Sequence, residues 1–141
     1  MRRHRYAVQA SVTAEGGPQA AVVGIAISDE ALLIFDTLES TRKCQNLRRD
    51  PRIAFVIGND GEATVQYEGT ADEPRGAELE RCKALYFERF PDGHEREAWP
   101  GITYFRVRPS WIRFSDFAGP SPRIEHFSAA DLIGDPRVPP R

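Results

Sequence analysis

The residues best suited to chemistry lie in one basic segment, Ser40 to Arg52. Its basic residues are Arg42, Lys43, Arg48, Arg49 and Arg52. Arg42 and Lys43 fall in the first turn of a predicted helix, where the helix dipole favours acidic residues instead. Free backbone N–H groups at a helix start, flanked by the Ser40 and Thr41 hydroxyls and two cations, are suited to bind one phosphate group. The alternative is a solvated basic face, and we interpret Arg48, Arg49 and Arg52 in that way.

Other common catalytic patterns do not occur in the sequence. The three histidines, His4, His94 and His126, have no metal-ligand spacing among themselves or with the two cysteines, so no metal site is predicted. No serine stands in a nucleophile-elbow pattern, and neither usual form of the glycine-rich phosphate loop is present. Cys44 and Cys82 are both interpreted as structural. The sequence assigns no catalytic residue.

A second candidate group, Trp111 with Arg113, belongs to the last predicted strand. There the two residues alternate with Ile112 and Phe114. If the apolar pair points into the core, Trp111 and Arg113 face outward together. An outward Trp–Arg pair is typical of a partner surface or of a site for a flat ligand, although an ordinary exposed pair gives the same pattern.

Alternation with a period of two dominates the chain and predicts strands. We expect them over residues 6–13, 19–28, 31–37, 52–58, 62–71, 102–108 and 110–117, with a hairpin turn at Asn59-Asp60-Gly61. A helix of about two turns is expected between Ser40, a suitable N-cap, and Pro51. A longer helix follows Pro74 and ends before Pro91. Gly24 indicates a bulge or a close approach to the backbone. This order predicts a mainly β (α+β) fold, a small antiparallel barrel of six or seven strands with a short and a longer helix.

Composition limits the function classes. The chain has 141 residues, a net charge of -2 and 40% hydrophobic residues, which fits one globular domain over residues 1–117 and an irregular, Pro-rich tail over residues 118–141. The balanced charge argues against general nucleic-acid or membrane binding. Two cysteines at unrelated positions favour a reduced compartment, and no signal peptide or transmembrane pattern is present, so a cytoplasmic location is expected.

Five motifs follow one another between residues 5 and 117. They are Pro18-Gln19-Ala20-Ala21-Val22-Val23, Phe35-Asp36-Thr37, Ser40-Thr41-Arg42-Lys43, Asn46-Leu47-Arg48-Arg49-Asp50-Pro51-Arg52 and Val65-Gln66-Tyr67-Glu68-Gly69. Their order resembles the pyridoxamine 5'-phosphate oxidase-like, FMN-binding split-barrel family. The resemblance implies a split barrel, a homodimer, and FMN in a groove at the subunit interface.

The resemblance also implies which residues bind the cofactor. Arg42 and Lys43, next to Thr41, would hold the FMN phosphate, and Thr37 with Asp36 would line the flavin and its ribityl chain. The remaining implied contacts are made to the flavin ring: the backbone of Ala21, Val22 and Val23, the strand position Thr64, and, from the second subunit, Trp111 and Arg113.

Two departures from the family pattern bear on the activity. Pyridoxamine 5'-phosphate oxidases carry a C-terminal Arg-Leu-His stretch that holds the substrate, whereas Ile112 to Phe117 follow Trp111 here, which argues against vitamin B6 oxidation. Asp36 stands where that oxidase has an aromatic residue, so the ligand environment differs.

Three functions follow as hypotheses. The first is an FMN-dependent oxidoreductase that takes a small-molecule substrate or an electron donor such as NAD(P)H. A related branch of the barrel shares the Asn46 to Arg52 run and uses 8-hydroxy-5-deazaflavin coenzyme, so a deazaflavin-dependent reductase is an alternative. A flavin or tetrapyrrole carrier or sensor without turnover is the third.

Overall fold

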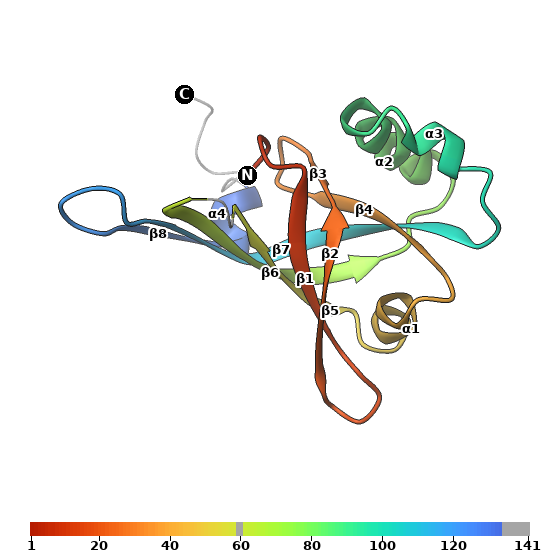
Figure 1. The fold of residues 1–141 in the computed structure, drawn as a ribbon, viewed down its shortest axis with the longest axis horizontal. Coiled ribbons are helices and arrows are strands. Elements are labelled where there is room, and N and C mark those ends of the chain that lie inside the picture. The colour runs from red at the N-terminus through yellow and green to blue at the C-terminus, as the bar shows by residue number, and fades with distance from the viewer. Residues whose placement is uncertain (59–60, 134–141) are drawn as a thin grey trace.

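The computed structural model describes residues 1–58 and 61–133. The predicted turn at Asn59-Asp60 and the end of the tail, residues 134–141, lie outside the described residues. Eight strands and four helices make up the described part of the chain (Figure 1). The strands are β1 (Tyr6–Val12), β2 (Pro18–Gly24), β3 (Ala26–Ile27), β4 (Leu33–Leu38), β5 (Arg52–Ile57), β6 (Ala63–Asp72), β7 (Ile102–Asp116) and β8 (Arg123–Ser128). The helices are α1 (Arg42–Arg49), α2 (Gly76–Arg89), α3 (Gly93–Arg96) and α4 (Ala129–Ile133).

The strands form one antiparallel sheet in the order β2-β1-β5-β6-β7-β4-β3, with β8 paired to β7. The sheet curls into a half-barrel, α2 and α3 lie together at one end, and α1 lies below the strands near the β1–β2 hairpin (Figure 1). The predicted mainly β split barrel is therefore confirmed, with eight strands in place of six or seven and with two further short helices within the described residues.

The predicted strand over residues 19–28 divides in two at Ile25. β2 pairs with β1 while β3 pairs with β4, and the Ile25 N–H donates to the Arg5 carbonyl oxygen at 2.8 Å. The expected close approach at Gly24 is confirmed, because the Phe90 ring packs against it. A Cβ atom at Gly24 would lie 2.9 Å from Phe90 Cζ, closer than packed atoms tolerate.

The two strands expected over residues 102–108 and 110–117 are a single strand, β7. Its pairing with β6 shifts register opposite Glu68 and Gly69. A Cβ atom at Gly69 would lie 2.3 Å from the Arg108 carbonyl oxygen, so glycine allows the two backbones to approach at this shift.

The irregular tail expected from residue 118 onward is wrong for residues 123–133. Strand β8 pairs with β7 from Trp111 to Asp116, and α4 follows it directly. The physical reason is that β7 extends beyond β4 and leaves backbone groups that a further strand can satisfy. Part of the Pro-rich segment thereby extends the sheet.

The core lies between the half-barrel and α1, and aromatic rings fill its centre. Phe35 stacks on Phe105 with ring centroids 5.4 Å apart, and Phe55 contacts both Phe35 and Tyr67 edge to face. The Tyr67 hydroxyl is buried within 2.8 Å and 3.0 Å of two main-chain carbonyl oxygens. None of the described helices is long and apolar enough to cross a membrane.

Candidate functional site

The first turn of α1 is organised by two threonine hydroxyls. Thr41, rather than the expected Ser40, is the N-cap, and its Oγ1 accepts from the Cys44 N–H at 3.4 Å. The same hydroxyl donates to the Leu38 carbonyl oxygen at 2.8 Å and lies 2.9 Å from Thr37 Oγ1. Thr41 is favoured over Ser40 because these contacts hold its oxygen in place at the helix start.

Arg42 and Lys43 are the first two residues of α1, directly after the N-cap Thr41. Lys43 Nζ donates to Thr37 Oγ1 at 3.5 Å. The Gln19 side chain of β2 lies between Asn46 and Arg42: one polar atom is 2.6 Å from Asn46 Nδ2, and its oxygen, when turned toward Arg42, accepts from the guanidinium Nε and Nη1 at 3.0 and 3.1 Å. Neither cation forms an ion pair with a carboxylate in the described part of the chain. Their two positive charges are therefore not offset by a neighbouring acid.

The electrostatics of α1 favour an anion at its start. Its first turn contains no acidic residue, whereas Arg48 and Arg49 lie in its last turn, where the dipole favours cations. The free N–H groups of the first turn therefore combine with two cations, while the Thr41 hydroxyl, which donates to Leu38 and accepts from Cys44, holds the turn in place. This arrangement is suited to bind one phosphate-sized anion.

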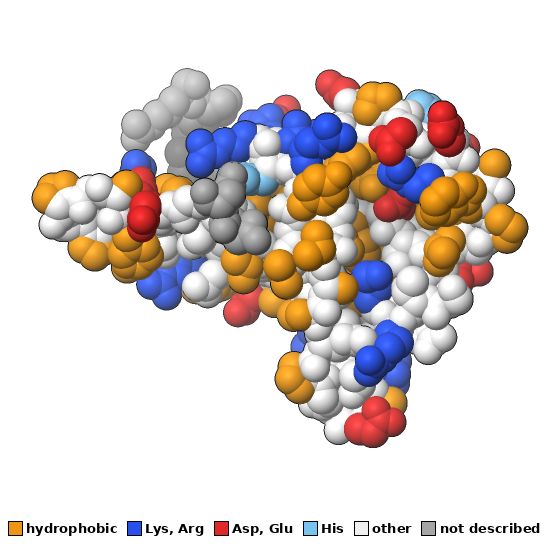
Figure 2. All heavy atoms as spheres, viewed as in Figure 1, with side chains coloured by type: hydrophobic (Ala, Val, Ile, Leu, Met, Phe, Trp, Pro, Cys, Tyr) orange, Lys and Arg blue, Asp and Glu red, His pale blue; other side chains and the backbone are white. Residues whose placement is uncertain are grey.

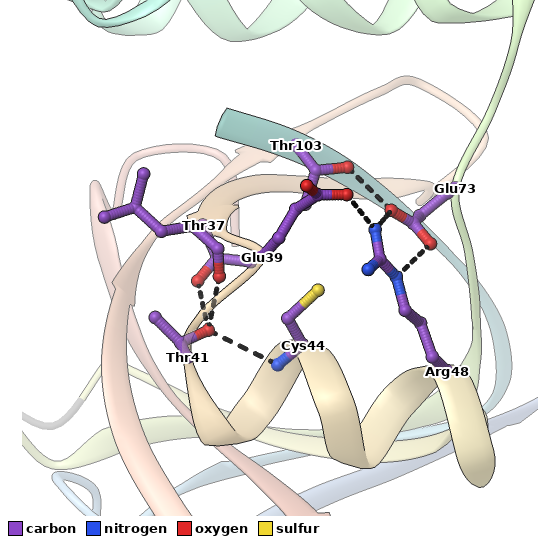
Figure 3. Close-up of polar contacts among 8 residues, drawn as sticks. Thr37, Glu39, Thr41, Cys44, Arg48, Glu73 and Thr103 are labelled. Atoms are coloured by element: carbon purple, nitrogen blue, oxygen red, sulfur yellow. Dashed lines mark hydrogen bonds and ion pairs between the residues drawn. The ribbon is translucent and has the colours of Figure 1, made fainter. Parts of the chain in front are cut away.

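Arg48 makes contacts that the sequence did not reveal. Its Nη2 lies 2.6 Å from Glu39 Oε1 and 2.7 Å from Glu73 Oε1, and its Nε donates to Glu73 Oε2 at 2.9 Å (Figure 3). The Thr103 hydroxyl also donates to Glu73, at 2.7 Å. The Arg48 guanidinium, followed by Thr103, holds the pKa of the Glu73 carboxyl below its usual value. We name Arg48, Glu39 and Glu73 the Arg48 clamp. Arg48 is thus exposed, as a solvated face requires, but it is paired with two carboxylates.

Cys44 lies under this clamp. Figure 3 shows its side chain pointing from α1 toward the side on which Glu39 and Arg48 meet. The residue has no exposed surface, and burial is the main cause that raises the pKa of its thiol. A buried thiol of raised pKa is a poor nucleophile, which fits the structural interpretation.

Asp36 lies on the opposite face of β4 from Thr37. It accepts from the Tyr86 hydroxyl at 2.8 Å and from Arg96 Nε at 3.3 Å, and Arg96 also pairs with Asp92 at 2.6 Å. Burial, followed by the hydrogen bond with Asp36, raises the pKa of Tyr86. The structure thus brings Thr37 to the start of α1 and Asp36 to the ends of α2 and α3.

The stretch predicted to run along the flavin ring belongs to β2, which is an edge strand. Ala21, Val22 and Val23 pair with β1 on one side only, so part of their backbone N–H and C=O groups are not used by the sheet. One end of β2 reaches Arg42 through Gln19, and the other contacts the Phe90 ring at Gly24. The strand therefore connects a cationic end with an aromatic end.

The other implied ring contacts are not near α1 within one chain. Trp111 lies eight residues along β7 from Thr103, the partner of Thr37, which is roughly 27 Å in a regular strand. Trp111 and Arg113 lie on the face of β7 opposite the buried Ile112, as predicted, and Thr64 pairs still further along, with Ser115. These three residues can complete a site at α1 only from another copy of the chain.

Comparison with known proteins decides the family. The family model described as pyridoxamine 5'-phosphate oxidase matches residues 1–116. This chain belongs to the pyridoxamine 5'-phosphate oxidase family. No curated protein matches the sequence.

Solved structures related to this member of the pyridoxamine 5'-phosphate oxidase family share its fold. A heme-binding protein from Mycobacterium smegmatis superimposes with a TM-score of 0.80 at 20% identity, over 92% of this chain and 55% of that one. An FMN-binding protein from Nostoc punctiforme, related to the same oxidase, has a TM-score of 0.71 at 12% identity, over 88% of this chain and 81% of that one. HutZ, a heme storage protein from Vibrio cholerae, has a TM-score of 0.68 at 15% identity, over 75% of this chain and 82% of that one. The chain spans about half the length of the Mycobacterium protein.

Proposed function

We propose that the chain is an FMN-binding flavoprotein, a flavin-dependent oxidoreductase that holds the FMN phosphate at the start of α1. One observation carries this proposal: Arg42 and Lys43 begin α1, next to the Thr41 cap and Thr37, with no carboxylate paired to either cation within the described residues. Membership of the family, which includes an FMN-binding relative from Nostoc, supports it.

The residues along β2 fit the rest of the cofactor. From Gln19, beside Arg42, the strand runs five residues to Gly24, a distance of roughly 17 Å. Its unpaired edge can supply backbone hydrogen bonds along the ribityl chain and the polar side of the ring. At the far end the Phe90 ring is buried under Tyr86 and Arg5, and the exposed Tyr6 ring, edge to face with Phe90 at 6.1 Å, can pack against a flat ligand.

A homodimer with the flavin between the subunits completes the proposal. The outer face of the half-barrel carries exposed apolar side chains, with Val22 67% and Val56 42% exposed. Figure 2 shows hydrophobic side chains over the region of β1 and β2, with Lys and Arg side chains nearby toward α1. On the same outer face, Arg113 Nε is buried without a hydrogen-bond partner in the described residues. A second copy seated on this face would cover the apolar side chains and bring its Trp111 and Arg113 toward the flavin.

FMN, when bound, would supply the electron or hydride transfer. The chain would bind the phosphate through Arg42 and Lys43, orient the ring along β2, and exclude water through the aromatic side chains at Gly24. The reaction would link a small-molecule substrate to an electron donor such as NAD(P)H.

Titration with FMN tests this function. We expect a yellow complex with a Kd at or below about 1 µM, and weaker binding of riboflavin, which lacks the phosphate. Reduction of the complex by NADPH and reoxidation by added acceptors would establish turnover. Competition with 8-hydroxy-5-deazaflavin coenzyme distinguishes the deazaflavin-dependent alternative. A protein that binds neither flavin at this concentration would contradict the proposal.

A tetrapyrrole carrier is the second candidate, because two structural relatives are named as heme-binding or heme storage proteins. Hemin titration separates the two functions: a saturable Soret shift in a protein that binds no FMN would favour the carrier. FMN binding without reduction or reoxidation would favour a flavin carrier or sensor.

A further inference from the structure

We propose that Arg48 is a positioning residue for the phosphate site: the Arg48 clamp fixes the first turn of α1 in the orientation that binds the anion. This inference rests on the proposed function, because it concerns the same helix start. The clamp residues Glu39 and Glu73 touch Arg48 and not Arg42 or Lys43.

The clamp joins both ends of α1 to the sheet. Glu39 lies between the end of β4 and the N-cap Thr41, while Arg48 lies in the last turn of the helix. Their contact at 2.6 Å therefore connects the last turn of α1 with the loop that precedes the first turn. Glu73, held by Thr103 of β7, fixes Arg48 from the other side with two hydrogen bonds. A planar guanidinium with two such partners resists rotation of the helix about its axis.

The charges of the clamp distinguish a positioning role from direct electrostatic attraction of the anion. Arg48 faces two carboxylates, so its positive charge is more than offset and the clamp adds no net attraction for phosphate. Direct attraction predicts that removal of the negative charge of Glu39 strengthens anion binding. Positioning predicts the opposite sign, because Glu39→Gln loosens the loop before Thr41.

Cys44 supplies a readout that needs no bound cofactor. Its thiol is fully buried on the side of α1 that the clamp covers (Figure 3). Cys82, the other cysteine, is buried on α2, so a Cys82→Ser background leaves one reporter thiol. Loosening of the clamp exposes Cys44 to a thiol reagent, even where the melting temperature is unchanged.

The experiment compares wild type, Glu39→Gln, Arg48→Lys and Arg48→Ala. Arg52→Ala is the control, because Arg52 is an exposed arginine that pairs with Asp50, only two residues away. FMN and riboflavin titrations, thermal melts and Cys44 labelling in the Cys82→Ser background are measured for each. We expect Glu39→Gln to weaken FMN binding about three- to fivefold, to leave riboflavin binding unchanged and to accelerate labelling by a similar factor. Arg48→Lys should resemble Arg48→Ala, since a lysine lacks the fork that reaches both carboxylates.

Two results would overturn the inference. Tighter FMN binding by Glu39→Gln would assign the clamp an electrostatic role only, and unchanged FMN affinity together with unchanged Cys44 labelling would show that the clamp positions nothing. If wild type binds no FMN, the proposed function fails by itself. Faster Cys44 labelling in Glu39→Gln would then still support the clamp as the device that holds α1, whereas unchanged labelling would reject it.

Discussion

Replacement of both Arg42 and Lys43 by alanine removes the two uncompensated cations from the start of α1. The Lys43 side chain is half-buried, and Arg42 is exposed but bonded only to the neutral Gln19 amide. A charge-assisted hydrogen bond contributes about 1.5–3 kcal/mol, and solvent screening places both residues at the lower end. The double variant should therefore bind FMN about 3 kcal/mol less tightly, which is roughly 150-fold in Kd.

Flavin fluorescence titration measures this loss, and two controls isolate the phosphate. The riboflavin Kd should stay the same, because riboflavin presents no phosphate to the missing cations. The double variant Arg52→Ala, Arg81→Ala removes two cations from exposed ion pairs with Asp50 and Glu78 and should bind FMN like wild type. Equal losses for FMN and riboflavin, or an FMN Kd within about threefold of wild type, would refute the assignment of the phosphate to α1.

Three further predictions concern the fold around the site. Gly24→Ala places a Cβ atom 2.9 Å from Phe90 Cζ and should lower the free energy of unfolding by about 1–3 kcal/mol in urea titrations; an unchanged value would mean that the ring moves aside freely. Tyr67→Phe removes the buried hydroxyl that lies within hydrogen-bond distance of two carbonyl oxygens and should cost about 1–3 kcal/mol, whereas Tyr6→Phe at an exposed position should cost nothing measurable. The pKa of Glu73 is lowered in the folded protein, so its contribution to stability is present above the pKa of the unfolded chain and is lost as pH falls through the folded value. Glu73→Gln should thus be less stable than wild type at pH 7 and lose less stability on acidification below about pH 5. An equal decrease in the free energy of unfolding of both proteins over this acidic range would contradict the prediction.

Local patterns in the sequence were enough to predict most of the barrel. Alternation of apolar and polar residues sets which face of a strand is buried, and Ile112 and Trp111 lie on the two faces of β7 that this pattern predicts. Pro51 and the N-cap expected at Ser40, one position before the observed cap Thr41, likewise predict where α1 begins and ends, because both act within a few residues of the helix.

Contacts between distant segments could not be predicted in the same way. Arg48 pairs with Glu73, 25 residues further along the chain, and no spacing rule connects the last turn of a helix with the residue that follows a strand. The contact of Asp36 with Tyr86, 50 residues further along the chain, is of the same kind, and it arises because Asp36 points to the opposite face of β4 from Thr37. Strand β8 was missed because its pairing depends on the free edge of β7 and not on its own composition.

The division of one chain segment at Ile25 has a consequence for how the protein folds during synthesis. β2 can pair with β1 as a local hairpin as soon as both have left the ribosome, and β5 and β6 can add to it in order. β3 and β4, although made immediately after β2, have no place on that growing sheet, because β4 pairs with β7, whose residues come about 65 positions later. The segment that leads into α1 must therefore wait for Ile102 to Val107 before it can dock. A nascent chain that ends before β7 has an incomplete barrel with an exposed core. The emergence of β7 from the ribosome therefore completes the sheet and fixes the start of α1 in its folded position.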